Sequence, residues 1–237
     1  MKKSQDVRLL VILAILLFII NYPFFDKALT NFLNTDEEVL VERVIDGDTI
    51  EAENRNESIR LLGVNSPERG EFYYEEAKQF LEGRILNETV LLKFGKDRYD
   101  KYDRILAYIF LDSKNINLEL VEQGYANYYF YGGRDQYSNA LEDAWNKCIE
   151  NEVNLCEPSA HECKKCISIN PDSIVNNCDS SCDINGWEIK GEGRDKVVFN
   201  GTLQLNEEAN FDLDLSDSGG SLFLRDGEGK LVLWESY

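Results

Sequence analysis

Apolar and polar residues alternate in short runs from residue 38 onward, which is the spacing of half-buried β-strands. Five such runs predict strands at residues 39–44, 49–52, 59–64, 89–94 and 105–110. Three other segments carry apolar residues at helical spacing, at residues 73–86, 115–123 and 136–150. Three strands, a helix, two strands and further helices form the order of a five-stranded Greek-key barrel of the OB type. We therefore expect a mainly β protein with some α-structure, and an OB-fold barrel with packing helices at residues 36–157.

The N-terminal segment has a different pattern. Lys2, Lys3 and Arg8 precede an unbroken apolar run at residues 9–20, which Phe24 and Phe25 extend after a short interruption. A run of this length, with basic residues before it, predicts a membrane anchor at residues 1–30. Basic residues stay on the cytoplasmic side, so we expect a single-pass protein of the cell membrane with its body outside. If the segment is a cleaved signal instead, the protein is secreted.

The C-terminal third lacks helical spacing. We interpret residues 158–183 as a Cys-rich connection, followed at residues 184–237 by a small all-β domain of short, glycine-punctuated strands. An even number of cysteines in an exported chain favours disulfide bonds, although the sequence does not determine which cysteines pair. The alternative is a zinc knuckle, because Cys163 and Cys166 are spaced like one ligand pair and Cys178 and Cys182 like another. The six cysteines are Cys148, Cys156, Cys163, Cys166, Cys178 and Cys182.

Composition narrows the chemistry. The 237 residues include 44 acidic and 25 basic ones, for a net charge of −19, and His161 is the single histidine. Catalysis by a Ser-His-Asp triad or a histidine-rich zinc site is thereby disfavoured. Both folded portions are acidic, so binding of nucleic acid by bulk electrostatics is disfavoured as well. Carboxylates, arginines, tyrosines or cysteines must supply the chemistry.

Charged residues stand where the strand pattern turns or breaks. Asp46 and Asp48 flank Gly47 between the first two predicted strands, and Arg60 and Arg104 each open an apolar strand. Each of these residues alone has an ordinary structural interpretation, as a turn or a salt bridge. Strand ends can also converge at one rim of a small barrel, where two guanidinium groups would match a phosphodiester.

The strand that Arg60 opens ends in Asn65, Ser66, Pro67 and Glu68. Oxygen ligands such as the Asp48 carboxylate, the Asn65 amide and the Ser66 carbonyl suit Ca²⁺ rather than zinc. A carboxylate such as Glu68 beside metal and phosphate can take a proton from an attacking water molecule.

Four blocks together strengthen this interpretation. Residues 44–50 (VIDGDTI), 59–68 (IRLLGVNSPE), 100–108 (DKYDRILAY) and 117–126 (NLELVEQGYA) resemble, in order and spacing, the staphylococcal nuclease (thermonuclease) family. The resemblance covers about residues 38–155. The resemblance implies two catalytic arginines, a catalytic glutamate, a calcium site and residues that contact the nucleotide. The catalytic positions hold Arg60, Glu68 and Arg104; the metal positions hold Asp46, Asp48, Asn65 and Ser66; the substrate positions hold Lys101, Tyr102 and Tyr129, or Tyr128 in its place.

The resemblance implies a Ca²⁺-dependent extracellular nuclease that hydrolyses DNA and RNA with low sequence preference and leaves 3′-phosphate ends. Asn65 stands where the family usually has an aspartate, so weaker Ca²⁺ binding is expected. The alternative function is a catalytically weak module on the cell surface that binds nucleic acid or protein. The presence of Arg60, Glu68 and Arg104 together favours the enzyme. We expect a monomer.

The C-terminal segments 183–189, 197–203 and 220–232 resemble a lamin-tail domain, a small immunoglobulin-like sandwich. The segment is short for that family, so the domain is also compatible with a start near residue 164. No ligand or site residue is assigned to it.

Overall fold

The computed structural model describes residues 36–130, 133–193, 195–215 and 220–237. The anchor expected at residues 1–30 lies outside these ranges. Among the residues described, no helix is long and apolar enough to cross a membrane. Contacts within the chain separate Met1–Glu37 from one compact unit, Glu38–Tyr237, which holds all the features below.

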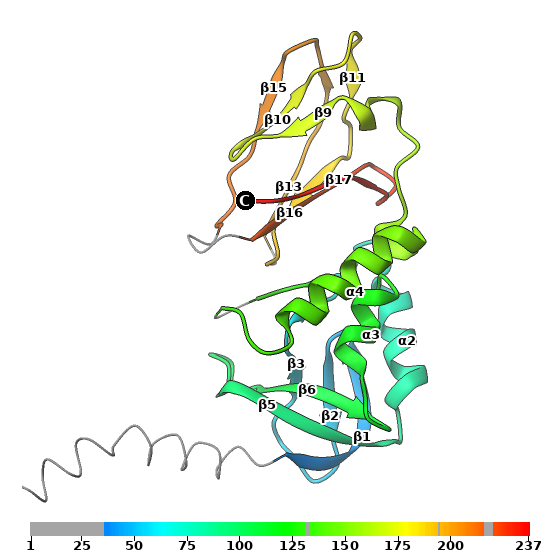
Figure 1. Cartoon of the computed structure of the whole chain (residues 1–237), viewed down its shortest axis with the longest axis vertical. Coiled ribbons are helices and arrows are strands. Elements are labelled where there is room, and N and C mark those ends of the chain that lie inside the picture. Colours follow the sequence, from blue (N-terminus) through cyan, green and yellow to red (C-terminus); the bar gives the residue numbers. More distant parts are fainter. Residues whose placement is uncertain (1–35, 131–132, 194, 216–219) are drawn as a thin grey trace, which may run out of the picture. The chain divides into compact units, whose positions relative to one another are not determined.

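A closed β-barrel forms the first part of this unit (Figure 1). Its strands run in the order β3-β2-β1-β5-β6, and β3 also pairs in parallel with β6, which closes the sheet. The two-residue strand β7 extends the sheet beyond β6. The expected five-stranded barrel is thus confirmed. Its strands are β1 (Glu37–Asp46), β2 (Thr49–Ala52), β3 (Ile59–Leu61), β5 (Thr89–Tyr99) and β6 (Ile105–Leu111), with β7 at Lys114–Asn115.

The prediction of one continuous strand at residues 59–64 is wrong. β3 ends at Leu61, and a separate strand β4 (Val64–Asn65) pairs with β8 (Asn127–Tyr128) outside the barrel sheet. Gly63 causes the break because its φ of 73° lies in the left-handed region, where glycine is favoured. A Cβ atom at this position would also collide with the side chain of Leu141. The break turns the chain so that Asn65 leaves the barrel wall.

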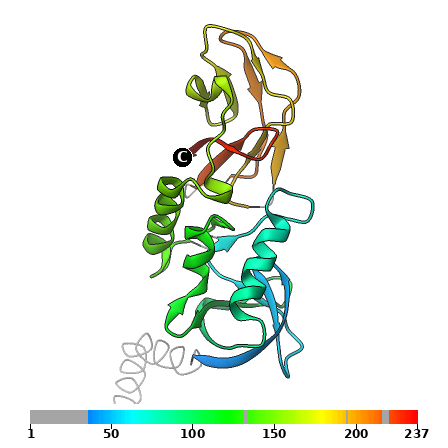
Figure 2. The same ribbon diagram turned by 90° about the vertical axis from the view of Figure 1, so that its right-hand side faces the viewer.

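Three helices cover the barrel: α2 (Tyr74–Ile85), α3 (Ile116–Glu122) and α4 (Ser138–Asn151). Figure 2 shows α2, in cyan, beside the blue strands of the barrel. Each helix buries one apolar face, as the sequence pattern predicted; in α4 that face is Leu141, Ala144, Trp145 and Cys148. Asn117 of α3 is fully buried, and its side chain bonds the backbone of Leu62 and Ile109.

The C-terminal part consists of β-sheets, as expected, with a short 3-10 helix, η2 (Glu162–Lys165). Its sheets have the orders β15-β10-β9, β11-β14 and β13-β12-β16-β17, and their buried residues form a second core that includes Ile174, Trp187 and Leu224. We call residues 158–237 the tail module. Its strands are β9 (Ile167–Ile169), β10 (Ser173–Asn176), β11 (Cys182–Asp183), β12 (Glu188–Lys190), β13 (Lys196–Val198), β14 (Thr202–Leu203), β15 (Glu208–Asn210), β16 (Ser221–Arg225) and β17 (Leu231–Ser236).

The Cys-rich segment is more ordered than its composition indicated. Strands β9 and β10 lie within residues 158–183 and pair with β15 of the same module. Disulfide bonds join Cys148 to Cys156, Cys163 to Cys182 and Cys166 to Cys178. Because all six sulfur atoms are paired, no thiolate is left for the zinc knuckle that was the alternative.

The barrel and the tail module share apolar contacts. Phe223 and Leu231 of the module belong to the barrel core, and the rings of Phe223 and Trp145 lie 5.2 Å apart in an edge-to-face arrangement. Tyr128 shares a hydrogen bond with Ser221, and the buried guanidinium of Arg225 donates to the carbonyl oxygen of Leu155. The module is therefore packed against the side of the barrel that carries β8.

Candidate active site

The turn between β1 and β2 carries two carboxylates. Gly47 is required between them, because a Cβ atom there would lie 2.7 Å from Ser66 and 2.8 Å from Ala77 of α2. The Asp48 backbone N–H donates to Asp46 Oδ1 at 3.1 Å. Burial, reinforced by the nearby Asp48 charge, raises the pKa of Asp46 to about 6. The turn thus concentrates negative charge in a partly buried place.

Asp48 is the centre of the hydrogen-bond network. Its Oδ2 accepts from the Ser66 backbone N–H at 2.7 Å and pairs with Arg60 Nη2 at 3.0 Å. Its Oδ1 accepts from the Thr49 hydroxyl at 3.1 Å. The Arg60 and Asp48 side chains are only 9% and 8% exposed, so this is a buried ion pair.

Arg60 is held by further acceptors. Nη1 donates to the carbonyl oxygens of Leu61 at 3.0 Å and Asp48 at 3.5 Å, and Nη2 donates to Asn65 Oδ1 at 3.3 Å. The predicted residues Asp46, Asp48, Arg60, Asn65 and Ser66 are therefore brought together by direct bonds. The orientation of Arg60 is set by the protein alone.

Asn65 uses its amide in two directions. The oxygen accepts from Arg60, while Nδ2 donates to the carbonyl oxygens of Glu192 and Gly193, both at 3.0 Å. Glu192 and Gly193 lie in the loop between β12 and β13 of the tail module. The side chain at the predicted metal position is thus also a contact to the module.

Glu68 follows in a tight turn before α2. Its backbone N–H donates to Glu71 Oε2 at 2.9 Å, and the Glu71 N–H donates back to the Glu68 carbonyl oxygen at 2.9 Å. Gly70 has a φ of 89°, which permits this turn. The Glu71 carboxylate also binds Lys190 and Lys196 of the tail module. Burial acts to raise the pKa of Glu71, but the Lys190 charge and several hydrogen bonds outweigh it and lower the pKa.

Arg104 directly precedes β6, the strand that pairs with β3 and thus with Arg60. In the parallel β3–β6 pair Ile59 faces Ile105 and Arg60 faces Leu106, and the first two residues are fully buried. Side chains alternate along an extended chain, so the position just before Ile105 belongs to the same face as Arg60. Its Nε donates to Asp100 Oδ2 at 2.7 Å, and its backbone N–H donates to Asp100 Oδ1 at 3.0 Å.

Lys101 and Tyr102 occupy the turn between Asp100 and Arg104. Both are exposed, Tyr102 to 63%. The Lys101 ammonium lies 5.1 Å from the Tyr102 ring centroid, and the Arg104 guanidinium lies 5.5 Å from it. An exposed aromatic ring flanked by two cations is suited to a nucleotide, since the ring can stack and the cations can meet phosphate.

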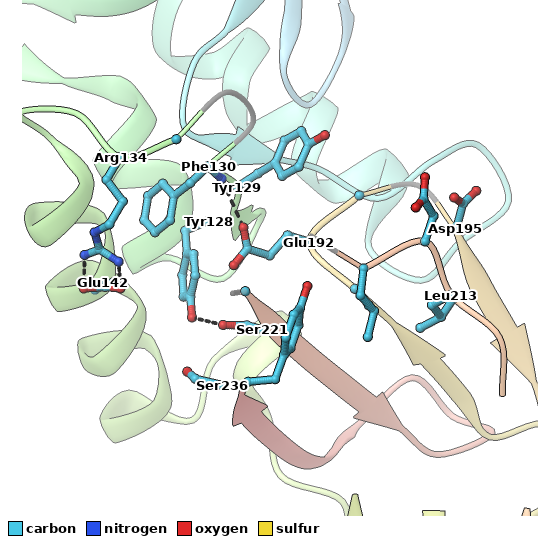
Figure 3. Close-up of a pocket in the computed structure, with 17 residues that line it drawn as sticks. Tyr128, Tyr129, Phe130, Arg134, Glu142, Glu192, Asp195, Leu213, Ser221 and Ser236 are labelled. Atoms are coloured by element: carbon cyan, nitrogen blue, oxygen red, sulfur yellow. Dashed lines mark hydrogen bonds and ion pairs between the residues drawn. The ribbon is translucent and has the colours of Figure 1, made fainter. Parts of the chain in front are cut away.

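Tyr129 lines a cleft of about 930 Å³ between β8 and the tail module (Figure 3). Its neighbour Tyr128 is buried and hydrogen-bonded to Ser221, whereas Tyr129 is half-buried. The Phe130 backbone N–H donates to Glu192 Oε2 at 3.1 Å across the same cleft. Of the two tyrosines, Tyr129 is the one better able to contact a ligand in the cleft.

The sequence did not indicate Glu71, Lys190, Lys196 or the loop that holds Glu192. The contacts that join the module to the site are distant in sequence: Asn65 and Gly193, for example, are 128 positions apart. The one local signal was the amide at position 65 where a carboxylate was expected. An amide has donors that a carboxylate lacks, and those donors bind the tail module.

Comparison with known proteins gives consistent matches. Residues 58–157 match the family model described as staphylococcal nuclease homologue. A thermonuclease of Staphylococcus intermedius is 33% identical over 170 residues, which cover 66% of this chain and 99% of that relative. A thermonuclease of Staphylococcus hyicus is 30% identical over 168 residues, with 65% and 98% covered. An uncharacterized endonuclease of Haemophilus influenzae is 34% identical over 126 residues, with 50% and 69% covered.

Proposed function

Because the chain belongs to the staphylococcal nuclease family and is therefore a hydrolase of the nuclease type, we propose that it cleaves phosphodiester bonds of both DNA and RNA. The cleavage has little sequence preference and leaves 3′-phosphate ends. The observation that carries the proposal is the buried unit of Asp48, Arg60, Asn65 and Ser66, with Glu68 two residues further along the chain.

The donor set fits a divalent cation, and we propose Ca²⁺. All available ligand atoms are oxygens, which Ca²⁺ prefers and zinc does not. The raised pKa of Asp46 reflects its burial and the Asp48 charge, and a bound cation would relieve that repulsion. Asp48, the Asn65 amide oxygen and the Ser66 carbonyl would hold the ion, with Asp46 beside them. When bound, Ca²⁺ would supply positive charge to a phosphate oxygen.

The side chains of the site have separate roles in the proposed reaction. Glu68 accepts a proton from the attacking water, which adds to phosphorus in line with the departing 5′ oxygen. Arg60 and Arg104 donate to the phosphate oxygens as negative charge increases in the transition state. Lys101 and Tyr102 contact the phosphate of the nucleotide, and Tyr129 lies near its base.

The test is cleavage of single-stranded DNA and of RNA by the full chain, with Ca²⁺ and then with EGTA. We expect Glu68→Gln to lower the rate by about 10²–10⁴, the usual contribution of a general base. Glu122→Gln, on α3 and paired with Lys147, is the matched control and should behave like the wild type. If the folded wild-type protein binds DNA at millimolar Ca²⁺ without cutting it, the proposed nuclease activity is refuted and a binding module is favoured.

We also propose that residues 1–30 anchor the protein in the cell membrane with its body outside, or direct its secretion. The basic residues before the apolar run and the three disulfide bonds support this, because disulfides persist in oxidising compartments. Protease added to intact cells should remove the body of an anchored protein. Full protection of the body, with none released to the medium, would contradict both forms of the proposal.

We propose further that the tail module is of the lamin-tail type. The support is an assembly of three short β-sheets around a core that contains Trp187, together with the sequence resemblance.

A further inference from the structure

Two lysines of the tail module face each other across a pair of strands. In the antiparallel β12–β13 pair Lys190 lies directly opposite Lys196. Like charges at directly opposite positions repel and destabilise a sheet. The Lys190 side chain is in addition only 9% exposed, and a buried charge without a partner is costly. This pair therefore needs an anion.

The barrel supplies that anion through Glu71. Its Oε2 lies 2.9 Å from Lys190 Nζ, and its Oε1 lies 2.8 Å from Lys196 Nζ. Lys196 Nζ also lies 2.7 Å from Glu188 Oε2 on the neighbouring strand. The Glu71 side chain is 14% exposed, so the contact is largely removed from water. Each oxygen of one barrel carboxylate is thus held by a different lysine of the module.

The same carboxylate fixes the backbone of Glu68. Glu71 Oε2 accepts hydrogen bonds from both the Glu68 backbone N–H and Lys190 Nζ. One shared oxygen atom therefore links Lys190 to the main chain of Glu68. The loop at the tip of the same hairpin accepts two hydrogen bonds from Asn65, three residues before Glu68. The hairpin of β12 and β13 therefore holds the segment from Asn65 to Glu71 at both ends.

We propose that Lys190 and Lys196 are positioning residues of the nuclease, which hold Glu71 and through it the main chain that carries Glu68. This inference rests on the proposed role of Glu68. The tail module is then part of the catalytic apparatus rather than a functionally separate domain.

A positioning role differs from simple adhesion between the module and the barrel. Loss of positioning displaces a group that acts in the chemical step, so it lowers kcat and leaves KM nearly unchanged. Loss of adhesion alone lowers stability without changing kcat of the folded protein. Lys190→Arg keeps a cation for Glu71 and should rescue kcat.

The experiment compares Lys190→Met, Lys196→Met, Glu71→Gln and Lys190→Arg in the full chain. Lys147→Met is the matched control, because Lys147 forms an ion pair with Glu122 on the barrel helices. We measure kcat and KM on single-stranded DNA with Ca²⁺, and hydrogen exchange of peptides that cover residues 67–74. We expect Lys190→Met to lower kcat by about tenfold or more, because small misplacements of a reacting group cost this much. Exchange at residues 67–74 should accelerate in the same variant and stay unchanged in Lys147→Met.

Hydrogen exchange does not depend on catalysis, so the inference and the proposed function can fail separately. A wild-type chain that does not cleave refutes the proposed function, whereas the exchange data still report whether the lysines hold this segment. The positioning role is overturned if Lys190→Met and Lys196→Met keep wild-type exchange and wild-type kcat while Glu68→Gln is inactive. If Lys190→Met does not fold, the more exposed Lys196→Met carries the test with the same two readouts.

Discussion

Arg60 lies on β3 and Arg104 directly before its neighbour β6 in the barrel, yet the surroundings of the two side chains differ greatly. Arg60 is 9% exposed and bonds to Asp48, Asn65 and the Leu61 carbonyl. Arg104 is 23% exposed and pairs with Asp100, only four residues earlier, beside the exposed ring of Tyr102. One half of the site is built by contacts between distant segments, and the other half by a local turn.

This difference indicates two kinds of contribution to one reaction. The half around Arg60 is ordered by the fold and by the tail module before a substrate arrives, which favours preorganised stabilisation of charge. The half around Arg104 has its aromatic ring and Lys101 in solvent, so it can adjust to a bound strand. Substitutions in the first half should affect both folding and rate, and those in the second half should affect mainly the rate.

The largest expected effect is that of Arg60→Ala. Removing the guanidinium leaves the Asp48 carboxylate buried without its partner, which costs about 3–5 kcal/mol of folding free energy. The rate should also fall by about 10²–10³, the usual value of one donor to a developing anion. Urea unfolding and steady-state kinetics of the full chain measure the two effects. An Arg60→Ala protein with wild-type stability would show that the pair is solvated rather than buried.

Arg104→Ala should separate the two effects. We expect a similar loss of rate, about 10²–10³, because Arg104 is proposed to act on the same phosphate. The stability should fall less than in Arg60→Ala. Asp100 is only 9% exposed, but its carboxylate keeps the hydrogen bonds from the backbone N–H groups of Tyr102 and Arg104. The same two measurements apply, with Arg84→Ala, which removes the Arg84–Glu119 pair, as the matched control. A large loss of stability here would refute the contrast between the two halves.

Asn65→Asp tests the connection of the first half to the tail module. A carboxylate cannot donate to the carbonyl oxygens of Glu192 and Gly193, so two hydrogen bonds are lost. We expect a loss of about 1 kcal/mol without a cation, because the two acceptors are only partly buried and a typical hydrogen bond contributes about this much. Added Ca²⁺ should raise the melting temperature of the variant more than that of the wild type, because a carboxylate adds charge to the site. Equal shifts in both proteins would mean that Asn65 is not a ligand position.

The sequence predicted the parts of this molecule that depend on local pattern. The five barrel strands and three helices follow from apolar spacing, and the site residues near Asp48 follow from the resemblance of four ordered blocks. The break at Gly63 was missed because the apolar run of residues 59–64 continues through this glycine, and the pattern does not record its left-handed backbone. Strands β9 and β10 are three and four residues long, too short for alternation to stand out in a Cys-rich segment.

The sequence pattern did not predict the contacts between the barrel and the tail module. The pairing of Glu71 with Lys190 joins residues 119 positions apart, and neither belongs to a local motif. Lys190 and Lys196 become a pair only through the register of β12 and β13. Such contacts depend on how two cores pack, which periodicity within either one does not specify.

The smallest expected effect is a change in how stability depends on pH. Burial alone would raise the pKa of Glu71, but Lys190, Lys196 and the Glu68 amide lower it below its usual value of 4.5. A carboxyl with a lowered pKa in the folded state stabilises the protein above its unfolded pKa, and this contribution is lost as the pH falls through the folded value. Glu71→Gln should therefore be less stable than the wild type near neutral pH, and the difference should shrink as the pH falls below 4.5. Urea unfolding at a series of pH values measures this, with Glu119→Gln as the control for a more exposed ion pair of the barrel. A stability difference that is constant across the acidic range would mean that the Glu71 charge is not what binds the lysines to the barrel.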